Sequence, residues 1–198
     1  MNLRPIFAIS VLAAGILSGK AQVNVALNAT VTLNGTFYTD GWSTAVPDAA
    51  PGDIVNGVFQ TETTEWDINS VWWNANDSDA ENNNIVINLG GTFTIGSFVV
   101  QADDNDDYHI AYWDSGTSSW IDAWDIPEIN SYGLVTRYDT LASPIVTSEL
   151  LFTATGGDGE YAVSQIEAFS TPDGSWTCAL LGGSLAAVAF LRRRFLRV

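Results

Sequence analysis

The chain has 198 residues, enough for one ordinary domain with short appended segments. Apolar residues make up 46% of it, so a packed core is expected, and 23 acidic residues against 7 Lys and Arg give a net charge of −16. Nucleic acid is excluded as a partner because phosphate binding needs a basic face. The single cysteine excludes an internal disulfide framework, and the single histidine, His109, excludes a metal site built from several histidines.

Charge is unevenly distributed along the chain. Residues 22–173 hold all the acids and one base, Arg137, a balance of 1 − 23 = −22. The other six bases lie within residues 4–20 and 192–197, beside apolar stretches. This layout is typical of an exported protein with a removable leader and a membrane-seeking tail.

Residues 1–21 predict a secretory signal peptide. Arg4 precedes an apolar run of about 15 residues, and the small residues Gly19 and Ala21 suit a cleavage site. Cleavage after Ala21 makes Gln22 the mature start. An uncleaved anchor helix is the alternative. An amphipathic core helix is disfavoured because the run has almost no polar residues at helical spacing.

Residues 22–171 predict an all-β domain. Short alternating runs separated by turn residues, such as Gly90-Gly91 and Asp114-Ser115-Gly116, are typical of a β-sandwich or barrel. The runs are Asn84–Leu89, Ile95–Gln101, Tyr108–Trp113, Leu134–Tyr138, Leu150–Ala154 and Val163–Phe169. The side chains expected in the core are Ile85, Ile87, Leu89, Phe98, Ile110, Leu150 and Phe152.

The order of features in this domain resembles the discoidin (F5/8 type C) family. The domain opens with Asn24-Val25-Ala26-Leu27-Asn28 and continues with Asn56-Gly57 ahead of Trp66. A strand end at Leu89-Gly90 follows, and the domain closes with Gln165-Ile166-Glu167-Ala168-Phe169. The resemblance implies a single galactose-binding-like jelly roll, a fold that includes sugar-binding modules.

Members of that family often hold a structural calcium where the chain ends meet, with an Asp of an Asp-Gly turn and a Glu of the last strand as ligands. The matching positions are Asn56 and Gln165, and two amides lack the charge that attracts calcium. The resemblance therefore implies a weakened calcium site, completed by oxygens of Asp53 and Thr61. The alternative is that Asn56 and Gln165 form hydrogen bonds across the same gap.

The densest acidic cluster, Asp103-Asp104-Asn105-Asp106-Asp107, falls between two predicted strands. Closely spaced oxygens suit calcium, but the order lacks the central Gly and the final Glu of an EF-hand. A solvated turn whose side chains bond their own backbone is the other interpretation.

Aromatic residues indicate a ligand site. Seven of the eight tryptophans lie in residues 22–171, and aromatic faces stack on sugar rings while short polar side chains give directional hydrogen bonds. Trp66 and Trp73 are expected in the core. The predicted ligand-binding residues, expected in loops, are Tyr38, Asp40, Trp42, Trp72, Asn105 and Asp107.

Two further polar residues have open roles. His109 alternates with Ile110 in a predicted strand, and nothing beside it supplies a nucleophile or a triad, so no catalytic residue is predicted. Arg137 either pairs with a neighbouring acid such as Asp139 or binds a ligand.

Residues 172–198 predict a membrane-seeking tail. Trp176–Leu191 contains no charge. As a helix this segment is about 24 Å long, against about 30 Å of hydrocarbon core. Arg192-Arg193-Arg194 follow, which places the C-terminus in the cytoplasm. A buried helix of a globular domain is the disfavoured alternative, because the segment has no amphipathic face.

The tail also resembles a bacterial sorting signal. Thr171-Pro172-Asp173-Gly174, then Leu180-Leu181-Gly182-Gly183, then the arginines follow the order of the PEP-CTERM class in its VPDSG-like variant. The resemblance implies recognition and processing by a membrane transpeptidase, an exosortase.

The leading functional hypothesis is an exported, non-catalytic protein that binds extracellular polysaccharide or another glycan. Before processing it is anchored in the cytoplasmic membrane by its tail, and afterwards it lies at the cell surface or outside the cell. The alternative is a structural surface or matrix protein whose domain contacts other proteins. A small hydrolase is the least favoured hypothesis, because the acids fall mostly in predicted loops.

Overall fold

The computed structural model describes residues 22–40, 49–76 and 82–171. The predicted leader 1–21, the predicted tail 172–198 with its spanning helix, and Trp42 lie outside these residues. In the described ranges, no helix is long and apolar enough to cross a membrane.

Antiparallel strands build the described domain, together with one short 3-10 helix. The elements are β1 (Thr30–Asn34), η1 (Pro51–Val55), β2 (Val71–Asn74), β3 (Asn84–Asp103), β4 (Asp107–Asp114), β5 (Ser119–Ile126), β6 (Leu134–Gly156) and β7 (Glu160–Ser170). The predicted all-β sandwich is confirmed.

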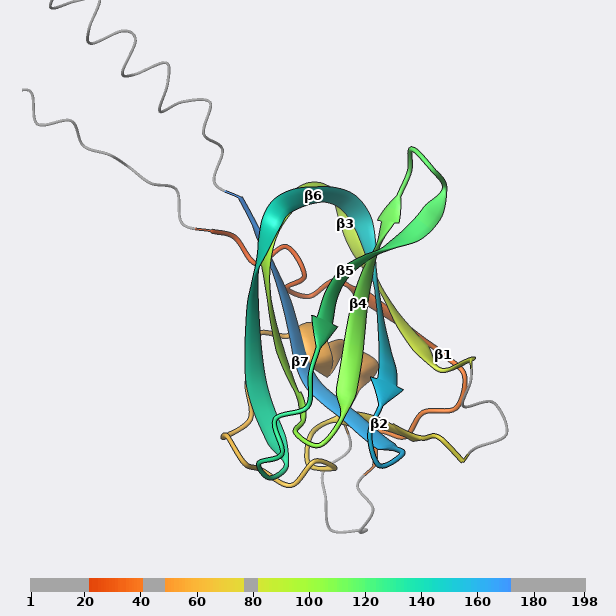
Figure 1. Cartoon of the computed structure of the whole chain (residues 1–198), viewed down its shortest axis with the longest axis vertical. Helices are drawn as coiled ribbons and strands as arrows, with labels where there is room; N and C mark the ends of the chain where they lie inside the picture. The colour runs from red at the N-terminus through yellow and green to blue at the C-terminus, as the bar shows by residue number, and fades with distance from the viewer. Residues whose placement is uncertain (1–21, 41–48, 77–81, 172–198) are drawn as a thin grey trace, which may run out of the picture. The chain divides into compact units, whose positions relative to one another are not determined.

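Two long strands, β3 and β6, belong to both layers of the sandwich (Figure 1). The second half of β3 pairs with β7 and with the start of β6, and β7 pairs with β2. The first half of β3 pairs with β1 and with the end of β6, and the end of β6 pairs with β4, which pairs with β5. The bend in the two long strands therefore joins the layers.

The prediction of a turn between two strands at Gly90-Gly91 is wrong, because the chain bends there within a single strand. The glycines lie inside β3, where the register with β6 shifts between Asn88 and Phe93. Gly90 has φ +73°, which a glycine adopts without strain. The predicted runs Asn84–Leu89 and Ile95–Gln101 are thus parts of one strand, β3. Likewise, Leu134–Tyr138 and Leu150–Ala154 are parts of β6.

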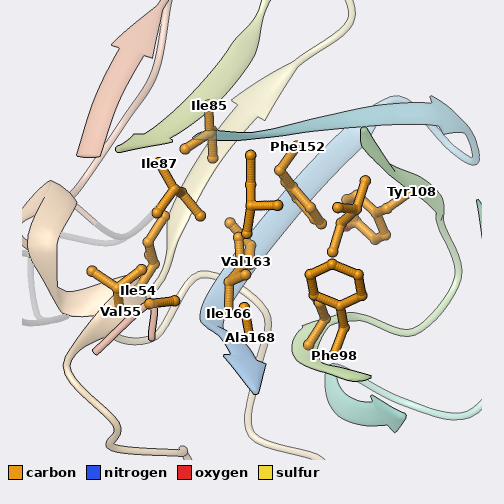
Figure 2. Packing of buried hydrophobic residues seen from close by; sticks show 14 of the residues in the cluster. Ile54, Val55, Ile85, Ile87, Phe98, Tyr108, Phe152, Val163, Ile166 and Ala168 are labelled. Carbon is orange, nitrogen blue, oxygen red and sulfur yellow. The ribbon is translucent and has the colours of Figure 1, made fainter. Parts of the chain in front are cut away.

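The core lies between the layers and contains all seven predicted side chains. Figure 2 shows four of them, Ile85, Ile87, Phe98 and Phe152, packed with their neighbours. Trp73 is buried as expected, and η1 contributes Ile54 and Val55. Phe152 stacks on Tyr108 with ring centroids 5.2 Å apart. Ile85, Ile87 and Leu89 alternate along β3, and Leu150 and Phe152 alternate along β6, so one face of each of these strand segments packs inward.

The two ends of the described segment lie side by side. Val25 N donates to Ala168 O at 2.7 Å, and Ser170 N donates to Val23 O at 2.9 Å. The β3–β4 and β5–β6 connections lie at the opposite end of the sandwich (Figure 1). Functional groups on these connections are therefore remote from the ends of the segment.

Truncation of the central ring tests the packing. Phe152→Ala should lower the free energy of unfolding by roughly 3–5 kcal/mol, because it leaves a cavity in a closely packed core. Chemical denaturation measures the change. Tyr138→Ala is the control, since that ring is 74% exposed and its loss should change stability by about 0.5 kcal/mol or less. Equal effects of the two substitutions would contradict the assigned core.

Candidate functional site

Three connections are held together at the end of the sandwich that is remote from residues 22 and 171. Asp104 O, in the β3–β4 connection, accepts from Ile129 N at 2.7 Å and from Asn130 N at 3.3 Å in the β5–β6 connection. The segment before β2 joins them, because Leu134 N donates to Thr64 O at 2.8 Å. These backbone bonds fix the relative positions of the connections.

The connections enclose a pocket of about 300 Å³. This volume is at the small end of the range for ligand pockets. The lining residues are Trp66, Asp103, Asp104, Asn105, Asn130, Ser131, Tyr132 and Gly133. The pocket thus combines two aromatic rings with short polar side chains.

Glycine is required at the edge of this pocket. Gly133 has φ +61°, and a Cβ there would collide with the backbone oxygen of Thr64. Any other residue would therefore push apart the two connections that carry Trp66 and Tyr132.

A buried cation supports the pocket from below. Arg137 on β6 is 5% exposed, and its Nη2 donates to the carbonyl of Asp103 at the end of β3. Its guanidinium carbon lies 5.6 Å from the centroid of the Tyr108 ring, within the range of a cation–π interaction. Nε and Nη1 have no hydrogen-bond partner among the described residues. Arg137 forms no ion pair with Asp139 or another acid among the described residues, and its bond to Asp103 O holds the strand end that lines the pocket.

Asp106 and Tyr108 extend this buried polar group. The Tyr108 hydroxyl lies 3.0 Å from Asp106 Oδ2 and 3.0 Å from Ala162 O, and it accepts from Ala162 N at 3.1 Å. Asp106 Oδ1 accepts from Asp158 N at 3.3 Å. The connection 103–107 is therefore not solvated as expected, because Asp103, Asp104 and Asp106 are buried. The expected bond to the local backbone is present, since Asp103 Oδ1 accepts from Asp104 N at 2.9 Å.

Burial changes the acidity of this group. It raises the pKa of Asp103 to about 7, with repulsion from Asp104 and Asp158 adding to the rise. Burial also raises the pKa of Asp106 to about 8, helped by repulsion from Asp103. The pKa of Tyr108 is raised by burial and by Asp106, and burial lowers the pKa of Arg137. At neutral pH Asp106 therefore keeps its proton for most of the time, and Asp103 is partly protonated.

Stability should fall as pH rises. Asp103 and Asp106 keep a proton in the folded state above pH 4, whereas in the unfolded chain they release it near 3.8. Their stabilising effect is present below pH 4 and is lost as pH rises through about 7 and 8. We expect the melting temperature to decrease from pH 5 to pH 9.

The isosteric substitution Asp106→Asn should flatten this decrease, because an amide does not titrate. Asp114→Asn, at a surface turn, should leave the slope unchanged. A melting temperature that rises between pH 5 and pH 9, or a slope unaffected by Asp106→Asn, would contradict the buried proton.

The predicted ligand-binding residues fall into two groups. Asn105 lines the pocket, and Asp107 lies next to it, with Oδ1 accepting from Glu128 N at 2.8 Å. Tyr38, Asp40 and Trp72 do not line the pocket. The expected exposure of Trp72 is wrong, because this ring lies in β2 and is 6% exposed.

Trp72 is held by its neighbours. It stacks on Tyr38 with ring centroids 4.3 Å apart, and its indole Nε1 donates to Asp40 O at 2.7 Å. These contacts indicate packing of the segment before the 41–48 stretch onto β2.

Trp66 and Tyr132 were not among the predicted ligand-binding residues. Trp66 was expected in the core, but it is only half-buried and lines the pocket. Tyr132 is 61% exposed and lies in the turn Ser131-Tyr132-Gly133. An aromatic beside glycine between two strands is the signal that could have identified it.

Asp53, Asn56 and Gln165 meet at the place where the resemblance implied calcium. Gln165 is buried, and with its amide oriented to satisfy both ends it donates to Asp53 O at 3.3 Å and accepts from Gly57 N at 3.0 Å. The Asp53 carboxylate accepts from Ala50 N at 2.7 Å and from Asn56 Nδ2 at 3.4 Å. Because an amide N–H is directed at the oxygen that a cation would need, these residues do not fit calcium.

The fourth proposed ligand, Thr61, belongs to a separate turn. Its carbonyl accepts from Thr64 N at 3.0 Å and from Thr64 Oγ1 at 2.7 Å. In the described ranges, no group of three or more His, Cys, Asp and Glu is placed to hold a metal ion.

Calcium should therefore have little effect on stability. A site occupied at 100 times its Kd would raise the melting temperature by roughly 5–10 °C. We expect no such difference between calcium and a chelator in differential scanning calorimetry. A rise of that size, abolished by Gln165→Leu, would show that calcium displaces the amide.

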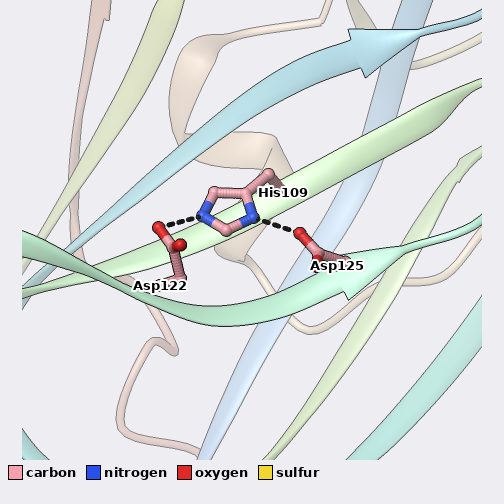
Figure 3. Close-up of polar contacts among 3 residues, drawn as sticks. All are labelled: His109, Asp122 and Asp125. Carbon is pink, nitrogen blue, oxygen red and sulfur yellow. Dashed lines mark hydrogen bonds and ion pairs between the residues drawn. The ribbon is translucent and has the colours of Figure 1, made fainter.

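His109 lies on the outer side of β4 between two carboxylates of β5 (Figure 3). Its Nε2 is 3.2 Å from Asp122 Oδ1, and its Nδ1 is 2.7 Å from Asp125 Oδ1. Donation to both acceptors requires a proton on each ring nitrogen. Both ring nitrogens thus face carboxylate acceptors, and the two aspartates are almost fully exposed, so these contacts lie at the protein surface.

Comparisons with known proteins identify the fold. No family model and no curated protein matches the sequence. The family 32 carbohydrate-binding module of NanJ from C. perfringens, in complex with galactose, matches with a TM-score of 0.52 at 17% identity, covering 75% of this chain and 98% of that chain. CpGH89CBM32-5 from Clostridium perfringens, in complex with GalNAc-β-1,3-galactose, matches with 0.52 at 13%, covering 76% and 100%.

A fucose-binding module of Streptococcus pneumoniae, SpX-3, matches with a TM-score of 0.51 at 11% identity, covering 75% of this chain and 98% of that chain. At these identities the likeness concerns the fold. The described domain has the galactose-binding-like fold of family 32 carbohydrate-binding modules, as the resemblance to the discoidin family implied.

Proposed function

We propose that the domain is a non-catalytic carbohydrate-binding module whose ligand occupies the pocket between Trp66 and Tyr132. The observation that carries this proposal is the meeting of two aromatic rings with Asn105 and Asn130 in one pocket fixed by backbone hydrogen bonds. Aromatic faces cover the apolar face of a sugar, and short polar side chains bond its hydroxyls.

The pocket predicts weak binding by one module. Burial of an aromatic face against a sugar ring stabilises the complex by about 1–2 kcal/mol, from about 25 cal/mol per Å² of apolar area. A pocket with room for one ring adds few further contacts. Useful retention then comes from many copies acting on one polymer.

The sequence supports a wider proposal about location. The leader, the acidic domain and the tail with its sorting-signal resemblance suit an exported protein that an exosortase-type enzyme processes at the cytoplasmic membrane. Extracellular polysaccharide is the partner that such a location makes available. The domain would then act at the cell surface or outside the cell.

Loss of the pocket rings tests the proposed binding. Tyr132→Ala should reduce retention on a polysaccharide affinity gel about 5- to 30-fold, the equivalent of 1–2 kcal/mol. Trp66→Ala should do the same, although its edge contact with Trp72, at 5.3 Å, gives this ring a packing role too. Tyr132 is the cleaner site because its exposed ring contributes little to folding.

Tyr138→Ala is the matched control, since Tyr138 is also an exposed tyrosine and lies on β6, outside the pocket. It should bind like the unaltered protein. Binding that survives both pocket substitutions would place the ligand elsewhere. Absence of glycan binding together with specific capture of a protein would favour the alternative of a structural protein that contacts other proteins.

A further inference from the structure

One hydroxyl joins three buried polar groups behind the pocket. Tyr108 Oη lies 3.0 Å from Asp106 Oδ2 and 3.0 Å from Ala162 O, and it accepts from Ala162 N at 3.1 Å. Ala162 is paired with Trp72 of β2, but the N–H and C=O of Trp72 bond to Tyr38 on its other side. The backbone groups of Ala162 are therefore directed to the Tyr108 hydroxyl, and all three members of the group are 0% exposed.

These bonds are complete only when Asp106 carries a proton. A tyrosine hydroxyl donates one hydrogen bond, and a carbonyl oxygen only accepts. When the hydroxyl donates to Ala162 O, the contact with Asp106 is a hydrogen bond only if the carboxyl donates to Tyr108 Oη. An ionised Asp106 would compete with Ala162 O for the same proton, so one buried acceptor would lose its donor, which is costly.

The surroundings of Asp106 also favour the neutral carboxyl. Burial raises its pKa to about 8, helped by repulsion from Asp103 at the end of β3 and from Asp158 in the β6–β7 turn. Arg137 attracts Asp106, but it attracts two other aspartates of the same connection as well, so its charge is divided. The other titratable groups around Asp106 are Asp104 and Asp107 in the same connection, Tyr108 on β4 and Tyr161 on β7.

Asp106 links its proton to the wall of the pocket. Its Oδ1 accepts from Asp158 N at 3.3 Å, and Asn105 Nδ2 donates to Asp158 Oδ2 at 2.8 Å. These two contacts hold the β3–β4 connection against the β6–β7 turn. Asn105 lines the pocket, and the carbonyl of Asp104 holds the connection that carries Tyr132. A charge on Asp106 would repel the Asp158 carboxylate and so loosen this wall.

We propose that the protonated carboxyl of Asp106 is part of the formed pocket, and that loss of this proton releases the β3–β4 connection from the β6–β7 turn and weakens glycan binding. The domain then retains glycan in acidic and neutral surroundings and releases it in alkaline ones. Asp103 has no such role, because its Oδ1 accepts from Asp104 N in either protonation state. This proposal rests on the proposed function, since glycan binding is the property that the proton controls.

Affinity electrophoresis of the full-length protein at two pH values tests the proposal. The probes are galactomannan, xyloglucan and dextran, three neutral polysaccharides without titratable groups, and retention is measured against gels that contain no polysaccharide. A carboxyl with a pKa of about 8 is about nine-tenths protonated at pH 7 and about one-tenth at pH 9, and the apparent affinity scales with the fraction that is competent to bind. We therefore expect the affinity to fall about tenfold from pH 7 to pH 9.

The substitution Asp106→Asn imitates the protonated carboxyl. Its amide nitrogen donates to Tyr108 Oη and its oxygen accepts from Asp158 N, and neither group titrates. We expect this variant to be retained equally at pH 7 and pH 9. Asp114→Asn, at a surface turn, is the matched control and should show the same tenfold fall as the unaltered protein. Circular dichroism at pH 9 checks that each protein remains folded.

Carbon-13 NMR of the free protein gives a readout that does not depend on a glycan. One aspartate carboxyl should titrate near pH 8, and its signal should be missing in Asp106→Asn. The side-chain carbons of Asn105 and Asp158 should shift over the same pH range, because the contact between them is released.

The outcomes distinguish the two proposals. Equal retention of the unaltered protein at pH 7 and pH 9 would overturn the role of the proton and leave the carbohydrate-binding function standing. A fall that persists in Asp106→Asn, or the absence of an aspartate that titrates near pH 8, would do the same. Failure of all three polysaccharides to retain the protein at either pH would overturn both proposals. If Asp106→Asn does not fold, retention and NMR of the unaltered protein still decide.

Discussion

The bond from Arg137 to the carbonyl of Asp103 is the constraint on which the pocket end of the domain depends. It joins β6 to the last residue of β3, where the β3–β4 connection begins. The next residue, Asp104, holds the β5–β6 connection through its carbonyl. A side chain inside the sandwich therefore fixes a loop at its edge, and through that loop the position of Tyr132.

The buried charged residues that fix the pocket lower the stability of the fold. Burying a guanidinium with two nitrogens that have no partner among the described residues is costly, and so is burying Asp103 and Asp106. The cation–π contact with Tyr108 and the protons held by the two acids offset part of this cost. A pocket fixed in advance loses less conformational freedom on binding, which matters when one sugar ring supplies little contact area.

Local sequence patterns were sufficient to predict the fold class and the core residues, but not to predict which residues line the pocket. Alternation marked Ile85, Ile87 and Phe152 as core residues, because burial on one face of a strand is a local property. Strands β1, β2 and β5 were not among the predicted runs, and the Trp72-Trp73 pair of β2 shows why: both rings are buried, so no alternation marks them. The pocket depends on which connections meet in space. Asn105 was found because it lies in an obvious polar cluster, whereas Trp66 and Tyr132 come from segments whose meeting no local pattern reports.

The most direct measurement is a 15N NMR titration of the protein with a soluble oligosaccharide prepared from the polysaccharide that retains it. If the pocket fixed by Arg137 is the binding site, chemical-shift changes should concentrate on the amides of Asp104, Asn105 and residues 129–133 and on the indole N–H of Trp66. Binding with changes confined to the other end of the sandwich, around Asp53 and Gln165, or to the His109 face of β4, would contradict it.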